Sequence, residues 1–258
     1  MIKAVFFDID GTLASFNTHQ VPPSARESIN RLRAKGIKVF IATGRRFQSI
    51  NNLGDLEFDG YITLNGGYCL LGKEQVIYKQ SIPHGDIQAI LHYQETVRKF
   101  PCALVQENGI YMNEIDEQVR SVFEMLNFPS PPIRPFNEIA DQTTYQLIAF
   151  FTQEQEREIM TVMPHSETTR WNPVFTDIVP KGINKSIGIN KILEHYGFTI
   201  DQTMAFGDGG NDIAMLQHAG IGVAMGNADE KVKASADYVT ETVDNDGIYQ
   251  ALIRYKLL

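Results

Sequence analysis

The stretch VFFDIDGTLASF (residues 5–16) leads from a run of apolar residues into two aspartates, Asp8 and Asp10, that are separated by one residue. An apolar run of this length is typical of a buried strand, and we expect a strand over 3–8. In open α/β sheets, ligands bind beyond the carboxyl ends of the parallel strands. Two carboxylates at that end of a strand therefore indicate a site, although a single aspartate there is more often a turn residue.

Strands and helices alternate in the two outer parts of the chain. Ser24 and Glu27 have the spacing of a capping box, so we expect a helix to begin there and to end at Gly36. A helix over 185–196 has apolar residues on one face and should end at Gly197. The other expected elements are strands 37–42, 60–64, 203–206, 221–225 and 237–240, a short helix from about 45, and helices 211–218, 228–235 and from about 248. This alternation predicts an α/β fold with a doubly wound parallel sheet.

The middle of the chain differs in composition from both ends. Only two of the 20 glycines lie between residues 83 and 180, whereas nine of the 11 prolines do. The shift predicts an inserted module over 83–180, with residues 1–82 and 181–258 forming the core domain. The insert also has an α/β pattern, with helices expected near 84–99, 116–127 and 153–163 and strands near 102–107, 110–113, 145–151 and 174–179.

Composition excludes several classes of protein. The chain has 258 residues, 43% of them hydrophobic, and a net charge of −8, which disfavours nucleic acids and anionic membranes as partners. The longest apolar run, 147–151, is far shorter than the roughly 20 residues of a membrane span, and we see no leader peptide. Two cysteines form neither a disulfide framework nor a metal cluster. We expect a cytoplasmic monomer or homodimer that acts on a small molecule.

Polar residues end four of the expected core strands. The strand ends are Asp8, Thr43, Asn65 and Asp208, and the adjacent loops contain Asp10, Lys185, Asn211 and Asp212. The carboxylates would repel one another unless a cation lay between them. Because every candidate donor is an oxygen and no histidine or cysteine has ligand spacing, the pattern predicts Mg²⁺, shared with a phosphate group.

Four motifs occur in a characteristic order: DIDGT (8–12), IATGR (41–45), KGINK (181–185) and GDGGND (207–212). In this order they resemble the haloacid dehalogenase (HAD) superfamily, and the place and length of the insert resemble its Cof-type sugar-phosphate phosphatases. YITLNGG and IGVAMGNA are also similar to segments of that branch. The resemblance implies a Rossmann-like core with an inserted α/β cap.

The resemblance also implies roles for individual residues. Asp8 is expected to be the nucleophile that forms an aspartyl-phosphate, and Asp10 the general acid and base. Thr43 and Lys185 would orient and neutralise the transferring group. The implied metal ligands are Asp8, Asp208 and the backbone carbonyl of Asp10, with Asp212 binding through water or supporting the ligands and Asn211 lying near the phosphate or Lys185.

Other assignments have simple structural alternatives. Arg45, with Gly44, is expected either to contact an anion at the mouth of the site or to pair with a surface carboxylate. Asn65 and Gly66 are candidates for the junction of core and cap, and Arg170, in RWNPVF (170–175), for contact with a sugar. In isolation, Thr43 is equally a helix cap and Lys185 a solvated first-turn lysine.

The sequence therefore predicts a Mg²⁺-dependent phosphatase of small phosphomonoesters, above all sugar phosphates. One alternative is a phosphotransferase or phosphomutase on the same scaffold, since fold alone does not separate these activities. Another is a sensor that binds a phosphorylated ligand without cleaving it.

Overall fold

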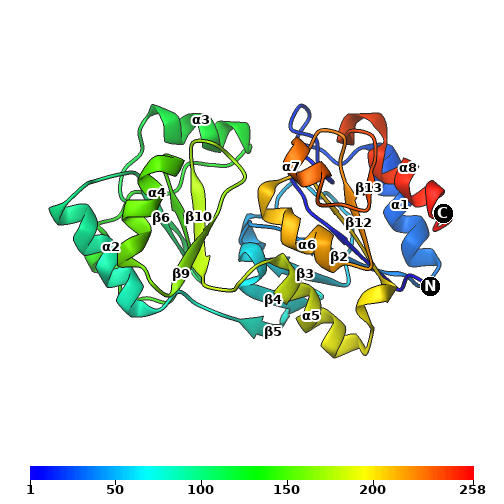
Figure 1. Ribbon diagram of the computed structural model, residues 1–258, viewed down its shortest axis with the longest axis horizontal. Coiled ribbons are helices and arrows are strands. Elements are labelled where there is room, and N and C mark those ends of the chain that lie inside the picture. The colour runs from blue at the N-terminus through cyan, green and yellow to red at the C-terminus, as the bar shows by residue number, and fades with distance from the viewer. The chain divides into compact units, whose positions relative to one another are not determined.

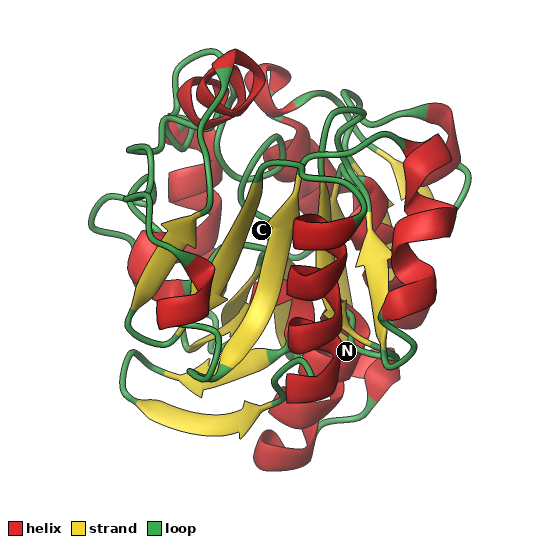
Figure 2. Ribbon diagram, turned by 90° about the vertical axis from the view of Figure 1, so that its left-hand side faces the viewer, coloured by secondary structure: helices red, strands yellow, loops and turns green.

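The protein consists of two compact units. The computed structural model describes all 258 residues and divides them into a core unit, Met1–Lys79 with Asn184–Leu258, and an inserted unit, Gln80–Ile183 (Figure 1). Figure 2 shows helices and strands lying side by side. None of the helices is both long enough and apolar enough to cross a membrane.

The core unit contains an eight-stranded sheet in the order β13-β12-β11-β1-β2-β3-β4-β5. The strands from β13 to β3 are parallel, and β4 and β5 continue the sheet in antiparallel pairing. Their bounds are β1 Ala4–Phe7, β2 Lys38–Ala42, β3 Gly60–Thr63, β4 Tyr68–Leu71, β5 Gln75–Lys79, β11 Thr203–Gly207, β12 Ile221–Ala224 and β13 Tyr238–Val239. The doubly wound α/β fold is confirmed.

Helices cover both faces of the core sheet, because the side chains of a strand alternate between its faces. Val5 and Phe7 of β1 pack with α1 and α8, whereas Ala4 and Phe6 pack with α5, α6 and α7. The core helices are α1 Pro23–Ala34, α5 Lys185–Tyr196, α6 Ile213–His218, α7 Glu230–Lys233 and α8 Gly247–Arg254. As expected, α1 and α5 are each followed by a left-handed glycine, Gly36 (φ +76°) and Gly197 (φ +65°).

The inserted unit is built on a separate antiparallel sheet in the order β7-β6-β8-β10-β9. Helices α2 and α4 contribute to one apolar cluster with this sheet, and α3 contributes to another (Figure 1). The elements are α2 His84–Thr96, β6 Cys102–Gln106, β7 Gly109–Met112, α3 Glu117–Met125, β8 Thr144–Ala149, α4 Gln153–Ile159, β9 Ser166–Thr169 and β10 Thr176–Pro180.

The structure corrects two local expectations and adds strands that were not expected. The capping box at Ser24 is wrong: Pro23 opens α1, so Ser24 is already helical, and its hydroxyl donates to Asp246 at 2.5 Å. The β4–β5 hairpin was not expected, and neither was β9. The helix expected from about 45 is only a 3₁₀ turn, Phe47–Ser49.

The topology places the ends of four parallel strands along one edge of the core sheet. Strand β1 lies between β2 and β11, and the chain winds away from it in both directions. Asp8 follows β1, Thr43 follows β2, a turn over Leu64–Gly66 follows β3, and Asp208 follows β11. The edge beside β1 is the switch point at which α/β proteins bind ligands.

Candidate active site

The turn after β1 brings the Asp208 carboxylate against the backbone of the DIDGT motif. The amides of Leu13 and Ala14 both donate to the carbonyl of Ile9, which folds the chain back sharply. Gly11 lies in this turn with φ +83°, and a Cβ there would lie 2.2 Å from Oδ2 of Asp208. Glycine is required at this position by both the backbone conformation and the close approach.

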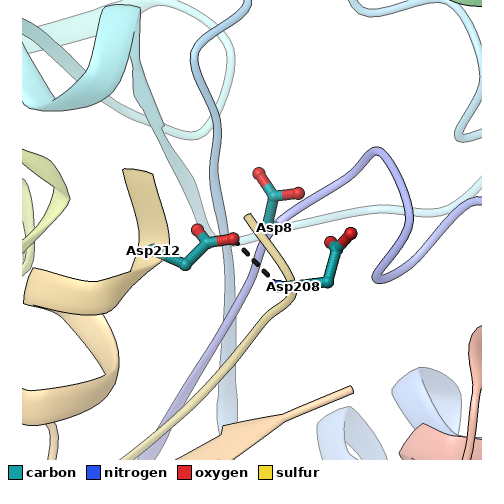
Figure 3. A group of neighbouring side chains, drawn as sticks. All are labelled: Asp8, Asp208 and Asp212. Atoms are coloured by element: carbon teal, nitrogen blue, oxygen red, sulfur yellow. Dashed lines mark hydrogen bonds between the residues drawn. The ribbon is translucent and has the colours of Figure 1, made fainter. Parts of the chain in front are cut away.

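Three aspartates converge at the carboxyl ends of β1 and β11. Asp8, Asp208 and Asp212 each offer a carboxylate oxygen, and these oxygens lie within 4.8 Å of one another (Figure 3). Asp8 and Asp212 are buried. We call these three residues the acidic cluster; Asp10 contributes no side-chain oxygen to it.

A buried lysine links two members of the acidic cluster. Lys185, the first residue of α5, is completely buried, and its Nζ donates to Oδ1 of Asp8 at 2.5 Å and to Oδ1 of Asp212 at 2.6 Å. Asn184 caps α5 by accepting a hydrogen bond from the amide of Ser186, which anchors the turn that carries the lysine. Three carboxylates against one ammonium leave two negative charges uncompensated when all four groups are ionised.

The pKa values of Asp8, Asp208 and Lys185 reflect this excess of negative charge. Burial, together with the carboxylates of Asp212 and Asp10, raises the pKa of Asp8 to about 7, despite the opposing effect of Lys185. Burial and the carboxylates of Asp8 and Asp212 also raise the pKa of Asp208 well above its usual range. Burial alone would lower the pKa of Lys185, but Asp212 and Asp8 outweigh it and raise that pKa. A set of oxygen donors with excess negative charge fits a hard divalent cation such as Mg²⁺.

Asp212 fastens the GDGGND loop to Lys185. Its Oδ2 accepts hydrogen bonds from the amides of Asp208 at 3.0 Å, drawn in Figure 3, and Gly209 at 2.9 Å. Its Oδ1 is bonded to Lys185. Both oxygens of Asp212 therefore already have partners within the protein.

Two residues that contact Asp208 were not singled out from the sequence. Thr12, completely buried, donates from Oγ1 to Oδ1 of Asp208 at 2.6 Å. Asn227, in the loop after β12, donates to Oδ2 of the same carboxylate at 3.3 Å. Both residues occur in segments that the sequence analysis quoted, DIDGT and IGVAMGNA, and this was the only available signal.

Arg45 forms a bidentate ion pair with Asp10 through the Nε and Nη2 atoms of its guanidinium group. Its Nε donates to Oδ2 at 2.7 Å and its Nη2 to Oδ1 at 2.6 Å. Behind this contact, Nη1 donates to the carbonyl of Ser49 and to Oδ1 of Asn51, and the arginine side chain is only 7% exposed. Of the two alternatives for Arg45, the structure shows a carboxylate partner, but that partner belongs to the DIDGT motif.

Thr43 and Asn65 lie on neighbouring turns. Thr43 is buried, its Oγ1 accepts from the amide of Arg45 at 3.1 Å across the bend at Gly44, and its carbonyl accepts from the amide of Asn65. The buried Asn65 accepts at Oδ1 from the side chain of Asn211 at 3.0 Å.

The turn after β3 is locally strained. Leu64 and Asn65 both have positive φ angles, +52° and +54°, which residues with a side chain rarely adopt. Gly66 follows with φ +102°, and a Cβ there would lie 2.1 Å from the carbonyl oxygen of Asn184. This close packing on the residue before Lys185 gives Gly66 a structural role.

Arg170 lies in the inserted unit, where its guanidinium is occupied by structural contacts. It binds Glu156 through Nε and Nη2, and it donates to the carbonyl oxygens of Phe151, Asn172, Pro173 and Phe175. These contacts hold the loop that contains Trp171, which packs edge-on against Phe175. We therefore do not include Arg170 among the proposed substrate contacts.

Comparison with known proteins identifies the class. Residues 5–252 match the family described as haloacid dehalogenase-like hydrolase. A solved structure of the HAD subclass IIB sugar phosphatase BT4131 is 45% identical, with a TM-score of 0.94, and the match covers 99% of this chain and 100% of that chain. A solved structure of BT1666 from Bacteroides thetaiotaomicron, described among phosphatases of the HAD superfamily, is 38% identical, with a TM-score of 0.93, and the match covers 100% and 96%.

One of the similar proteins has a name that specifies its substrate. The 5-amino-6-(5-phospho-D-ribitylamino)uracil phosphatase YcsE of Bacillus subtilis (strain 168) is 30% identical over 259 residues, which are 99% of this chain and 96% of that protein. The chain therefore belongs to the haloacid dehalogenase-like hydrolases, and within them it is a phosphatase. The resemblance read from the four motifs is confirmed.

If the acidic cluster binds a cation, the raised pKa values of Asp8 and Asp208 should make that binding dependent on pH. Below about pH 7, the Asp8 carboxyl holds a proton that a cation must displace. Above that pH, the ionised carboxylates repel one another, and a bound cation stabilises the folded protein more strongly. We expect Mg²⁺ to raise the melting temperature more at pH 8 than at pH 6, with the binding constant falling about tenfold per pH unit below 7 if one proton is displaced.

Thermal unfolding with Mg²⁺ and with a chelator, at both pH values, measures this effect. Asp208→Asn, which removes one carboxylate of the acidic cluster, is expected to lose most of the Mg²⁺-induced shift. An equal shift at pH 6 and pH 8 in the unaltered protein would contradict the assignment.

Proposed function

We propose that the protein is a Mg²⁺-dependent phosphatase that hydrolyses sugar phosphates or similar small phosphomonoesters through an aspartyl-phosphate at Asp8. The observation that carries the proposal is the acidic cluster, with one buried ammonium and excess negative charge, at the switch point of the core sheet. The substrate class is supported by the similarity to a sugar phosphatase over nearly the whole chain.

Asp8 is suited to attack phosphorus. Its Oδ1 is held by Lys185, which leaves Oδ2 as the attacking atom. A bond forms between Oδ2 and phosphorus while the bond from phosphorus to the ester oxygen breaks, and the leaving alkoxide takes a proton. Water then attacks the phosphorus of the aspartyl-phosphate, which releases inorganic phosphate and restores the Asp8 carboxylate.

The cation would be held by the carboxylates of Asp8 and Asp208, with the backbone carbonyl of Asp10 as a further ligand. When bound, it supplies positive charge that screens the repulsion between the carboxylate nucleophile and the anionic phosphate. Asp212, whose two oxygens have protein partners, would support this set by holding Lys185 and the amides of Asp208 and Gly209.

Other residues of the site would receive the phosphoryl group. Lys185 provides an ammonium bonded to the Asp8 carboxylate, and Thr43 provides a hydroxyl at the end of the neighbouring strand β2. Together they would neutralise and orient the transferring oxygens. Asn211, the residue before Asp212, donates to Asn65 and would be a further donor to the phosphoryl group. We propose that Asn65 acts by positioning Asn211.

Asp10 would move the protons of both steps. It would give a proton to the leaving oxygen in the first step and take one from water in the second. Both of its oxygens accept hydrogen bonds from Arg45, which fixes its orientation. To give a proton in the first step, one of these two contacts must open so that the freed oxygen can carry the proton. We propose that Arg45 positions Asp10 and that it is not a direct phosphate ligand.

The first test is phosphate release from a panel of phosphorylated sugars, phosphorylated sugar alcohols and nucleotides, with Mg²⁺ and with a chelator. Asp8→Asn should lower release by ~10³-fold or more, because the amide is a poor nucleophile. Asp55→Asn, a change at an aspartate whose side chain is 92% exposed and which is paired with Arg26 at the surface, is the matched control and should leave release unchanged.

Three outcomes would contradict the proposal. Phosphate release by Asp8→Asn at the native rate would rule out Asp8 as the nucleophile. Phosphate release that is insensitive to the chelator would rule out a required metal. Transfer of the phosphoryl group to a second sugar with no free phosphate would indicate a phosphotransferase or mutase.

The role of Arg45 predicts a dependence on the leaving group. A sugar alkoxide needs a proton as it departs, whereas 4-nitrophenolate does not. Arg45→Ala should therefore lower the rate of the first step by about 10- to 100-fold on a sugar phosphate and by much less on 4-nitrophenyl phosphate, because a misplaced acid affects only the substrate that needs it. Arg45→Lys should recover little, since an ammonium does not reproduce the two-point contact.

Single-turnover kinetics on the two esters measure this difference directly. Arg33→Ala, which removes a surface arginine that pairs with Glu57, is the control for loss of an ion pair. Equal losses on the two esters in Arg45→Ala would refute a role through Asp10.

A further inference from the structure

Asn227 joins three segments of the chain through one side chain. Its Nδ2 donates to the carbonyl oxygen of Gly11 at 2.8 Å and to Oδ2 of Asp208 at 3.3 Å. Its Oδ1 accepts a hydrogen bond from the amide of Val243 at 3.1 Å. The side chain thus connects the turn after β1, the end of β11 and the loop before α8.

The loop that carries Asn227 is fixed to its surroundings by backbone contacts. The amide of Gly226 donates to the carbonyl of Glu241, and a Cβ on Gly226 would lie 2.8 Å from the backbone of Thr240 and Glu241. The amide of Ala228 closes a turn onto Met225. Asn227 is an exposed residue, but both ends of its amide are held by neighbours.

The two oxygens of Asp208 are held by two different donors. Thr12 bonds Oδ1 at 2.6 Å and Asn227 bonds Oδ2, while a Cβ on Gly11 would lie 2.2 Å from Oδ2. A carboxylate fixed at one oxygen still rotates about that contact, whereas one fixed at both does not. Asn227 therefore completes the restraint on a member of the acidic cluster.

We propose that Asn227 is a positioning residue for the cation site: it fixes the rotation of the Asp208 carboxylate and its place relative to the Gly11 carbonyl. This inference rests on the proposed function, because it takes Asp208 to be a metal ligand. Partners that orient metal ligands typically contribute 10- to 100-fold to metal affinity, because they remove the freedom that the ligand would lose on binding.

The expected consequence is a loss of metal affinity with little loss of chemistry. The hydrogen bonds of Asn227 go to Gly11, Asp208 and Val243, and the nucleophile Asp8 is not among its partners. Asn227→Ala should therefore weaken Mg²⁺ binding by about 10-fold or more. At saturating Mg²⁺, kcat should return to within a few-fold of the native value.

The experiment is calorimetric titration of Mg²⁺ into the full-length protein in the absence of substrate. Asn17→Ala is the matched control, because Asn17 also donates from its amide to an aspartate, Asp244, at 2.8 Å, but outside the acidic cluster. Melting temperatures without Mg²⁺ are measured for each variant. If Asn227→Ala fails to fold, Asn227→Ser, whose hydroxyl is too short to bridge the three segments, takes its place in the same comparison.

The outcomes separate this proposal from the proposed function. A weaker Mg²⁺ affinity in Asn227→Ala, with Asn17→Ala unchanged, supports the assignment. Native affinity in Asn227→Ala, with or without a lower melting temperature, overturns it and leaves a structural role only, while the proposed function stands. Absence of Mg²⁺ binding by the unaltered protein overturns both.

Discussion

The site depends on one interaction, the buried contact of the Lys185 ammonium with the carboxylates of Asp8 and Asp212. A completely buried lysine is strongly unfavourable unless its charge is paired and hydrogen-bonded. Here one partner lies at the end of β1 and the other in the turn over Gly210–Asp212 that follows β11, so the contact fixes the start of α5 against the segments that meet at the switch point. The same contact compensates only part of the negative charge of the acidic cluster. The remaining negative charge is the physical reason why we propose a cation at this site.

The two aspartates of the DIDGT motif occupy different environments although one residue separates them. Asp8 is buried beside a lysine and two further carboxylates, and its pKa is raised to about 7. Asp10 lies outside that group and is held at both oxygens by Arg45, which is itself anchored from behind by Ser49 and Asn51. Two neighbouring aspartates need such different environments if one is to act as nucleophile and the other is to transfer protons. In the proposed mechanism, Arg45 would keep Asp10 in a defined place while Asp8 reacts.

The parts of the fold that could be predicted from sequence are those that local chemistry determines. Apolar runs ending in Asp8 and Asp208 indicated the central strands, and the glycines at 36 and 197 marked the helix ends at which the structure has left-handed residues. The capping box at Ser24 failed because Pro23 is equally suited to start a helix, and the helix begins there with Pro22 as its N-cap. The short strands β4, β5 and β9 were missed because each is held by its pairing partner more than by its own residues.

The candidate site, too, could be predicted from the sequence only in part. The strand-end residues were found because parallel strands must bring their ends to one edge, but the bonds that orient them join distant residues. Thr12 and Asp208 are separated by 196 positions, and Asn227 and Gly11 by 216. Likewise, the sequence allowed Arg45 an anion or a surface carboxylate, and only the three-dimensional structure shows its bidentate contact with Asp10. Side-chain orientation at the site is a tertiary property, so composition and spacing did not reveal it.

The central claim is that Asp8 receives the phosphoryl group, and the most direct measurement is to trap it there. In Asp10→Asn, the loss of the base should slow hydrolysis of the intermediate, and 4-nitrophenyl phosphate should still phosphorylate the enzyme because its leaving group needs no proton. Acid quenching followed by peptide mass spectrometry should locate a phosphoryl group on Asp8, absent when Asp8→Asn is added. Turnover of the ester without phosphorylation of Asp8, or a phosphoryl group on another residue, would contradict the account.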